Sequence, residues 1–380
     1  MTLRSLRNRI KGLFGSAPSG QQGEAIMRVA PLEPEANRNA ASYSPDDPIR
    51  GKDEDRFNRW PFAQRVAETI ALREDPSSLV VGIYGVWGDG KTSTLHLMQE
   101  ALRSYPHVVQ VPFNPWYFES EAGLLRGFFD TLTDALNRSL PTRVERLGEL
   151  LEQYGAIVTV LSGGTVSGVS EAGRALSNVK LEELRIRVEE ILRGAGKRVT
   201  IFIDDIDRLD REEIQALFKL VKLSAGFERI VYVLSFDDEV VAEALGEKYG
   251  KGGVQAGRKF LEKIVQVPLH LPAADELSLR KLTFEGVDAA VKLAGIELTE
   301  DHVNAFVRHF VDGFEPSLTT PRQAKRYANA LTFALPVLKG EVHPVDQMLI
   351  EGIRVFYPEL YVALRDNEDV LLKSGLHQNL

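Results

Sequence analysis

Short apolar runs alternate with helical patterns over most of the chain. Five runs have the length and β-branched content of strands buried on both faces of a parallel sheet. They are predicted at residues 79–84, 107–113, 199–203, 230–234 and 264–269. Helical periodicity lies between them, at residues 91–104, 120–154, 179–193 and 210–223. The alternation predicts an α/β fold with a parallel sheet and right-handed crossovers.

The pattern changes at both ends of this region. No convincing strand follows residue 275, so residues 275–380 are predicted to form a helical C-terminal domain. Residues 47–274 are then the α/β core, with a helical insertion at about residues 120–195. Residues 15–46 are rich in Gly, Ser, Ala, Pro, Gln and Asn, which is typical of a linker. Residues 1–46 are therefore predicted to be a flexible N-terminal segment.

Two segments raise the question of membrane contact. Residues 1–14 place apolar side chains at helical spacing among four basic residues, which predicts a short basic amphipathic helix. It could bind a membrane surface or a partner, but a frayed terminus or a helix docked on its own protein is favoured, because one short helix binds bilayers weakly. Residues 156–170 carry no charge but are shorter than a bilayer span, so a loop or helix hairpin is favoured. Membrane association is not expected.

Composition narrows the class of protein. The 380 residues are 44% hydrophobic and 26% charged, which fits a globular chain of two packed domains. The net charge of −8 removes a simple basic-surface argument for nucleic-acid binding. The absence of cysteine excludes disulfides, thiol catalysis and cysteine metal sites. Because no secretory signal is visible, a cytoplasmic location is expected.

A glycine-rich loop follows the first predicted strand. Residues 85–92, GVWGDGKT, fit the phosphate-binding pattern G-x-x-x-x-G-K-[ST] between a strand and a helix. Backbone N–H groups and the helix start would form the anion cradle, with Lys91 reaching the β- and γ-phosphates and Thr92 offering its hydroxyl to Mg²⁺. The residues predicted to bind ATP are Gly85, Trp87, Gly88, Asp89, Gly90, Lys91, Thr92 and Ser93.

The third predicted strand runs into three carboxylates, in the sequence DDIDR. Asp204 would lie at the carboxyl edge of the sheet, where ligands bind in open α/β folds. It is the predicted Mg²⁺ partner, through water, since Mg²⁺ keeps several of its waters. Asp205 points to the other face and would orient or deprotonate the attacking water. A solvated turn is the alternative, and the neighbouring phosphate loop weighs against it.

Several segments together resemble the KAP family of P-loop ATPases, over about residues 46–370. They are GVWGDGKTS, DDIDR, GRKFLEKIVQVPLHLP, DEDRFNRWPFA, FNPWYFES, TPRQAKRYANAL and FYPELYVALRDN. The resemblance implies an AAA-like ATPase that uses ATP and Mg²⁺, with sheet order 5-1-4-3-2 and a helical domain behind it. Many members carry transmembrane helices between the two nucleotide motifs. Only the stretch at residues 156–170 stands there, so the chain looks like a soluble bacterial member.

The resemblance also implies roles for residues outside the two motifs. Ser235 matches a polar residue that senses the γ-phosphate, although it could be an ordinary strand-end serine. Arg322 matches the arginine of the helical domain that tracks the γ-phosphate, with Arg326 as a rival and a solvated helix face as the alternative. Arg258, or its neighbour Lys259, would be the finger supplied to another subunit, although a salt-bridged surface residue is the simpler interpretation.

Two further expectations concern aromatic and adenine contacts. Trp116 is predicted to be a core anchor rather than a nucleotide-sensitive switch, because a buried tryptophan contributes a large apolar area. The adenine pocket is predicted to use residues 47–62.

The leading hypothesis for function is an ATP-driven switch or motor. It would act with partner proteins encoded nearby, and a homo-oligomer and a role in bacterial antiphage defence are further expectations. The alternatives are a nucleotide-stabilised scaffold with little turnover and a nucleic-acid-stimulated ATPase, for which the sequence gives no support.

Overall fold

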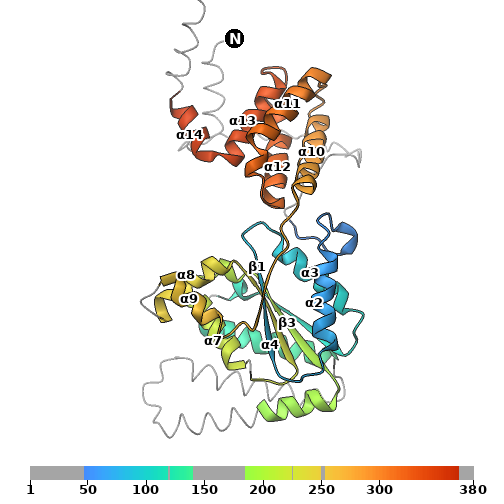
Figure 1. Ribbon diagram of the computed structural model, residues 1–380, viewed down its shortest axis with the longest axis vertical. Helices are drawn as coiled ribbons and strands as arrows, with labels where there is room; N and C mark the ends of the chain where they lie inside the picture. The colour runs from blue at the N-terminus through green and yellow to red at the C-terminus, as the bar shows by residue number, and fades with distance from the viewer. Residues whose placement is uncertain (1–46, 119, 140–184, 225, 250–252, 368–380) are drawn as a thin grey trace, which may run out of the picture. The chain divides into compact units, whose positions relative to one another are not determined.

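The computed structural model describes residues 47–118, 120–139, 185–224, 226–249 and 253–367 (Figure 1). The predicted N-terminal helix, the uncharged stretch at 156–170 and the last residues of the predicted C-terminal domain lie outside the described residues. So does much of the predicted helical insertion, of which residues 120–139 and 185–195 are described.

A five-stranded parallel sheet forms the centre of the core. Its strands are β1 (Leu79–Tyr84), β2 (Val108–Phe113), β3 (Arg198–Ile203), β4 (Ile230–Phe236) and β5 (Val267–His270). The order is β2-β3-β4-β1-β5, with every neighbouring pair parallel. The predicted order 5-1-4-3-2 is therefore confirmed. Because the strands are parallel, the ends of β1, β2, β3 and β4 that carry the predicted site residues share one edge.

The fifth strand begins later than the sequence predicts. Ile264 and Val265 are buried, but their N–H groups donate to Leu261 O, at 2.9 and 2.8 Å, in the turn after α9 (Gly253–Leu261). Their apolar character serves packing against the core rather than strand pairing. β5 instead begins at Val267, and Pro268 is tolerated within it because β5 is an edge strand.

Helices cover both faces of the sheet (Figure 1). On one face, α2 (Trp60–Leu72) and α3 (Lys91–Leu102) pack against alternate residues of β1 and β4, with Ile83 and Val233 fully buried. The other face is covered by α4 (Glu121–Ser139), α7 (Arg211–Ser224) and α8 (Asp238–Tyr249). This alternation explains why the strands read as continuous apolar runs.

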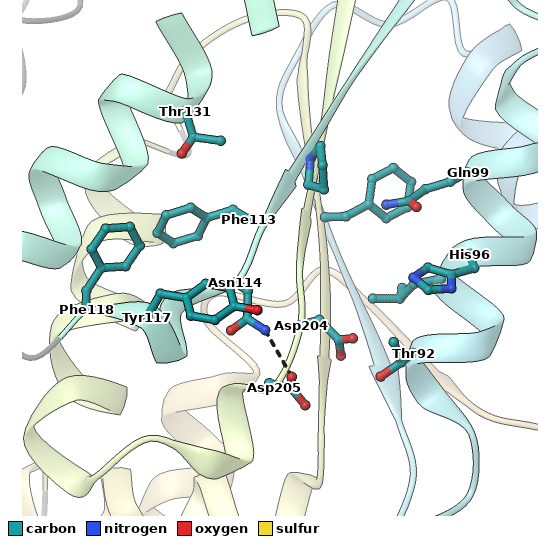
Figure 2. Close-up of a pocket in the computed structure, with 13 residues that line it drawn as sticks. Thr92, His96, Gln99, Phe113, Asn114, Tyr117, Phe118, Thr131, Asp204 and Asp205 are labelled. Atoms are coloured by element: carbon teal, nitrogen blue, oxygen red, sulfur yellow. Dashed lines mark hydrogen bonds between the residues drawn. The ribbon is translucent and has the colours of Figure 1, made fainter. Parts of the chain in front are cut away.

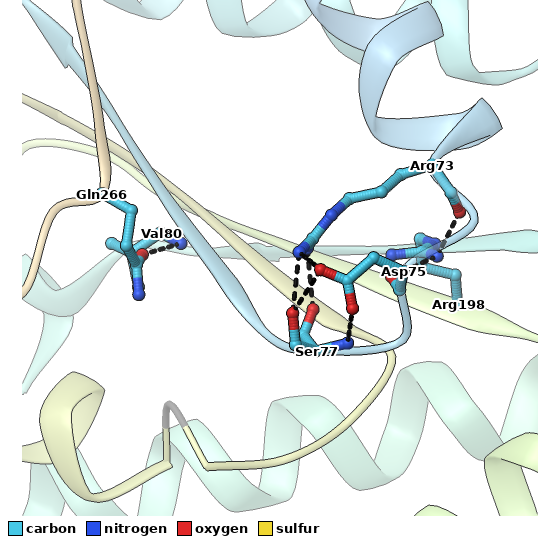
Figure 3. Close-up of polar contacts among 6 residues, drawn as sticks. All are labelled: Arg73, Asp75, Ser77, Val80, Arg198 and Gln266. Carbon is cyan, nitrogen blue, oxygen red and sulfur yellow. Dashed lines mark hydrogen bonds and ion pairs between the residues drawn. The ribbon is translucent and has the colours of Figure 1, made fainter.

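Polar contacts lie at the amino-terminal ends of the strands, opposite the ends that carry the phosphate loop (Figure 3). Arg198, the first residue of β3, donates to the carbonyl oxygen of Arg73 at 2.6 Å. Arg73 in turn pairs with Asp75 and donates to Ser77 O at 2.7 Å. Gln266 accepts from Val80 N at 2.6 Å. The Arg198 contact ties the loop between α2 and β1 to the start of β3, and the Gln266 contact joins β1 to the residue before β5.

Residues 276–366 form helices around a separate hydrophobic cluster. The helices are α10 (Glu276–Leu293), α11 (Glu300–Gly313), α12 (Pro321–Val337), α13 (Pro344–Phe356) and α14 (Pro358–Asp366). Phe310 and Tyr327 are fully buried at its centre. Thr299 and Thr320 begin α11 and α12 as N-caps, with side-chain oxygens that accept backbone N–H groups. Among the described helices, none combines the length and apolarity needed to cross a bilayer.

Candidate functional site

The loop between β1 and α3 has a backbone that depends on glycine. Gly88 and Gly90 have φ values of 95° and 91°, in the left-handed region that favours glycine. A Cβ at Gly90 would lie 2.7 Å from Arg59 Nη1, and one at Gly88 would lie 3.0 Å from Arg322 Cβ. Asp89 Oδ2 accepts from Val86 N at 3.1 Å and closes the loop on itself. The local sequence therefore fixes a tight turn that delivers Lys91 to the first position of α3.

Arg59 hydrogen-bonds to this loop, and the sequence analysis did not predict it as a site residue. Its side chain is buried, donates to the carbonyl oxygen of Asp89, and donates to Pro272 O at 3.0 Å. Burial lowers the pKa of Arg59, and the nearby Asp89 and Asp55 oppose that effect. Burial likewise raises the pKa of Asp89. Arg59 thus joins the phosphate loop to the segment that leads from β5 to the helical domain.

Six of the eight predicted loop residues and both predicted acids line one pocket, which Gly85 and Asp89 do not line. Its volume is about 220 Å³. From the loop and α3 come Trp87, Gly88, Gly90, Lys91, Thr92 and Ser93; the opposite wall carries Asp204, Asp205, Asp207 and Arg208. Lys91 Nζ donates to Gly85 O at 2.9 Å and to Asp207 Oδ2 at 3.0 Å. Two segments far apart in sequence therefore meet at the carboxyl edge of the sheet.

Asp205 is held by two donors that come from different elements. Asn114, directly after β2, donates from Nδ2 to Asp205 Oδ2 at 3.0 Å (Figure 2). Arg208 Nε lies 2.9 Å from Asp205 Oδ1. Burial and the adjacent Asp204 raise the pKa of Asp205, while Arg208 and Asn114 act to lower it. Asn114 was not predicted as a site residue, although it lies at the end of a strand and in the segment FNPWYFES, which carries part of the family resemblance.

A second cavity of about 400 Å³ opens beside these acids (Figure 2). Thr92, His96 and Gln99 of α3 lie on one side, and Asn114 and Tyr117 on the other. Asp204 and Asp205 line both this cavity and the pocket at the phosphate loop. Asp204 and Asp205 are therefore shared by the pocket at the phosphate loop and the second cavity, which is large enough for water or a side chain.

The residues present fit a Mg²⁺ ion. Thr92 and Asp204 line the same pocket and offer a hydroxyl and a carboxylate, which are oxygen ligands of the kind Mg²⁺ prefers. Gly88 and Gly90 carry no side chain, which leaves room for Arg322 and Arg59 to approach the loop. Thr92 and Asp204 would hold the ion, which would supply charge neutralisation at the β- and γ-phosphates when bound.

The helical domain contributes to the same pocket. Pro321, Arg322 and Lys325 of α12 line it, and Arg322 Cζ lies 4.6 Å from the centroid of the Trp87 ring. Arg326, the rival of Arg322, is exposed and does not line the pocket. Lys325 was not predicted as a site residue; its Nζ donates to Asp47 O at 3.3 Å.

Two predicted residues outside the phosphate loop lie away from the pocket. Ser235 is fully buried on β4, opposite Ile83, and its Oγ has no hydrogen-bond partner among the described residues. Arg258 lies on α9 and pairs with Glu239 at 3.5 Å, with 44% of its side chain exposed. Neither lines the pocket at the phosphate loop.

The prediction that Trp116 is a core anchor is wrong. Trp116 is 55% exposed, in the short 3₁₀ helix η2 (Pro115–Tyr117), and Tyr117 beside it is 75% exposed. Arg208 Cζ lies 5.7 Å from the centroid of the Trp116 ring. The neighbouring Phe113 and Phe118 stack together instead, with Phe113 buried. Trp116 therefore meets a cation at the rim of the site.

A third cavity, of about 600 Å³, adjoins the loop at Gly90 and Ser93. The segment before α2 supplies most of its walls, including Pro48, Ile49 and Phe57. Ile49 is fixed there, since Ser93 Oγ accepts from its N–H at 3.2 Å.

Similarity to known proteins extends over most of the chain. The model of the KAP family P-loop domain matches residues 59–338. The Phage T7 exclusion protein of Escherichia coli K12 is 23% identical over 350 residues, which cover 83% of this chain and 46% of that protein. The chain thus spans about half the length of this relative.

Solved structures with similar folds include the ORC2 protein of Aeropyrum pernix, at 13% identity and a TM-score of 0.40, over 83% of this chain and 71% of that one. Another is Cdc6p of Pyrobaculum aerophilum, at 15% identity and a TM-score of 0.35, over 88% and 67%. The family match covers most of the sequence, including the phosphate loop and the acidic strand end. The chain belongs to the KAP family of P-loop domain proteins.

Proposed function

We propose that this protein is a Mg²⁺-dependent ATPase that works as a switch with partner proteins. One observation carries the proposal: Lys91 and two glycines of the loop line a single pocket together with Asp204 and Asp205. A cation, a hydroxyl, two carboxylates and a glycine turn at the start of a helix are the parts that phosphoryl transfer requires. The chain's own chemistry is therefore positioning, charge stabilisation and the transfer of one proton.

Each group has a distinct role in this proposal. The Lys91 ammonium binds the β- and γ-phosphate oxygens, and the Thr92 hydroxyl and the Asp204 carboxylate hold the metal. Asp205 orients the attacking water and takes its proton, with Asn114 fixing the direction of the carboxylate. Arg322 brings a positive charge to the pocket from the helical domain, so closure of that domain and phosphate binding favour each other.

The adenosine part is assigned to the cavity beside Gly90 and Ser93. It is walled by residues of the segment before α2 and by Leu282 and Pro321 of the helical domain. A cavity of about 600 Å³ is within the range of small-molecule sites. Ser235 remains a proposed contributor near the γ-phosphate, and Arg258 a proposed finger toward a second copy of the chain.

The proposed antiphage setting rests on the relative rather than on the pocket. Because that relative is a phage exclusion protein, we propose an antiphage role in bacteria, with ATP turnover controlled by other proteins. Its test is phage plating on a host that expresses the wild type or Lys91→Ala. Protection that depends on Lys91 supports this role, and equal plating with both counts against it.

The ATPase is tested by Mg²⁺-dependent ATP binding and hydrolysis at several protein concentrations. We expect Lys91→Ala to weaken binding at least about tenfold, and Asp205→Asn to bind normally but lose turnover by about a hundredfold or more. Lys263→Ala, at an exposed lysine, is the control and should match the wild type. A wild type that binds no ATP would refute the proposal, and a rise in specific activity with concentration would favour sites completed by a second copy.

A further inference from the structure

The ammonium of Lys91 already has an anionic partner. Its Nζ lies 3.0 Å from Asp207 Oδ2, and the two side chains are 8% and 9% exposed. The same nitrogen contacts the loop carbonyl oxygens of Gly85 and Val86, at 2.9 and 3.4 Å. A carboxylate oxygen therefore takes the place beside Lys91 that a phosphate oxygen would take.

The turn after β3 is built to bring Asp207 to this position. Asp205 has a φ of 57°, which reverses the chain in the left-handed region, and residues Ile206–Arg208 then form the single 3₁₀ turn η3. Ile206 is fully buried and anchors the turn in the core. From this anchor Asp207 reaches the phosphate loop, and Arg208 reaches Asp205 and the ring of Trp116.

Phosphates and Asp207 compete for one cation. Like charges a few ångströms apart repel strongly where water is limited, and a buried ammonium is destabilised when it has no partner. Asp207 and Lys91 line one pocket with Gly88, and their side chains are only 9% and 8% exposed. A nucleotide that places phosphate oxygens on Lys91 must therefore displace the Asp207 carboxylate.

We propose that Asp207 is an internal counter-ion of Lys91, which nucleotide phosphates displace, and that its release moves the η3 turn. This inference rests on the proposed function, since it takes the cradle to bind ATP. The same turn carries Arg208, which holds Asp205 and covers part of Trp116. Phosphate arrival at Lys91 is thereby transmitted to Asp205 and to the exposed aromatic rim. Asp207 is a positioning residue in this scheme.

The first test is equilibrium ATP binding, with and without Mg²⁺, to the wild type, Asp207→Asn and Asp210→Asn. Asp210→Asn removes the same charge at an exposed position, and asparagine keeps the cap that Asp210 provides to Glu213 N. We expect Asp207→Asn to bind ATP about fivefold more tightly, or more, and to melt at a lower temperature without nucleotide. Asp210→Asn should leave ATP affinity unchanged.

Equal or weaker ATP binding by Asp207→Asn would overturn the inference. Weakening that appears only with Mg²⁺ would also overturn it, because Asp207 would then act on the metal. If the wild type and Asp210→Asn bind no ATP, the proposed function fails instead.

A second measurement does not need the Asp207 variant to fold. The sequence has three tryptophans, so in a protein with Trp60→Phe and Trp87→Phe only Trp116 remains. We expect saturating ATP to change its emission, because Arg208 moves with the turn. Unchanged emission at saturation would contradict the movement of η3.

Discussion

Arg322 of α12 lies over the ring of Trp87 in the phosphate loop, with 4.6 Å between its Cζ atom and the ring centroid. Beside it, Gly88 leaves so little space that an added Cβ would approach Arg322 Cβ to 3.0 Å. Trp87 is nevertheless 67% exposed. The loop and the first turn of α12 thus meet through one cation and one aromatic ring, at the mouth of the pocket.

This contact predicts a fluorescence signal from Trp87. A cation–π contact at an exposed site contributes about 0.5–1 kcal/mol, and a phosphate is a stronger partner for a guanidinium. With Trp60 and Trp116 changed to Phe, we expect Mg²⁺–ATP to change the emission of Trp87. Arg322→Ala should reduce that change by at least about half. Arg326→Ala, at an exposed position of the same helix, is the control; an undiminished signal in Arg322→Ala would count against the contact.

Replacing Asn114 should affect ATP turnover without affecting ATP affinity. It contacts Asp205 at 3.0 Å and is 91 residues away in sequence. We expect Asn114→Ala to lower turnover about tenfold while ATP affinity stays within about twofold, since only the orientation of the base is lost. Gln110→Ala on the same strand, where the amide donates to Gln99 O, should leave both unchanged. A large loss of ATP affinity in Asn114→Ala would contradict this role.

The sequence could predict those features of the site that depend on residues close together along the chain. The phosphate loop and the acidic strand end are local patterns, so the sequence alone indicates Gly85–Thr92 and Asp204–Asp205 as candidates, and the sheet order followed from the family resemblance. The Lys91–Asp207 pair spans 116 residues and depends on the turn that a left-handed Asp205 creates. Nothing in the spacing of DDIDR says which carboxylate faces the lysine.

Two errors have the same physical origin. Trp116 was assigned to the core, and Ile264 to a strand, because apolar side chains were expected to be buried within regular elements. Trp116 is instead exposed beside Arg208, and Ile264 is buried in a turn. Hydrophobicity predicts burial better than it predicts backbone conformation, and an aromatic ring can meet a cation at the surface.

Arg59 and Arg56 offer a comparison between a buried and an exposed arginine in their effects on stability. Arg59 is buried and donates to Asp89 O and Pro272 O, whereas Arg56 pairs with Glu285 at 2.6 Å on the surface. We expect Arg59→Ala to lower the free energy of unfolding by about 2–3 kcal/mol, because two carbonyl groups lose a charged donor. Arg56→Ala should cost about 1 kcal/mol or less. Denaturant unfolding measures both, and equal effects would show that the buried contacts add no stability.

Asp75 predicts an acid-dependent stability at the opposite edge of the sheet. Hydrogen bonds from the Ser77 side chain and backbone, helped by Arg73, lower the pKa of Asp75 from 3.8 to about 2 (Figure 3). A carboxylate whose pKa is lower in the folded state stabilises that state fully above its unfolded pKa. This contribution is lost as the pH falls through the folded pKa.

The unfolding free energy of the wild type should therefore exceed that of Asp75→Asn at about pH 5, and the difference should shrink toward about pH 3. Denaturant unfolding across this range measures the difference directly. Asp312→Asn, at an exposed aspartate of α11, controls for the removal of one charge. A difference that stays constant with pH would mean that the carboxylate of Asp75 acts through its shape and hydrogen bonds rather than through its charge.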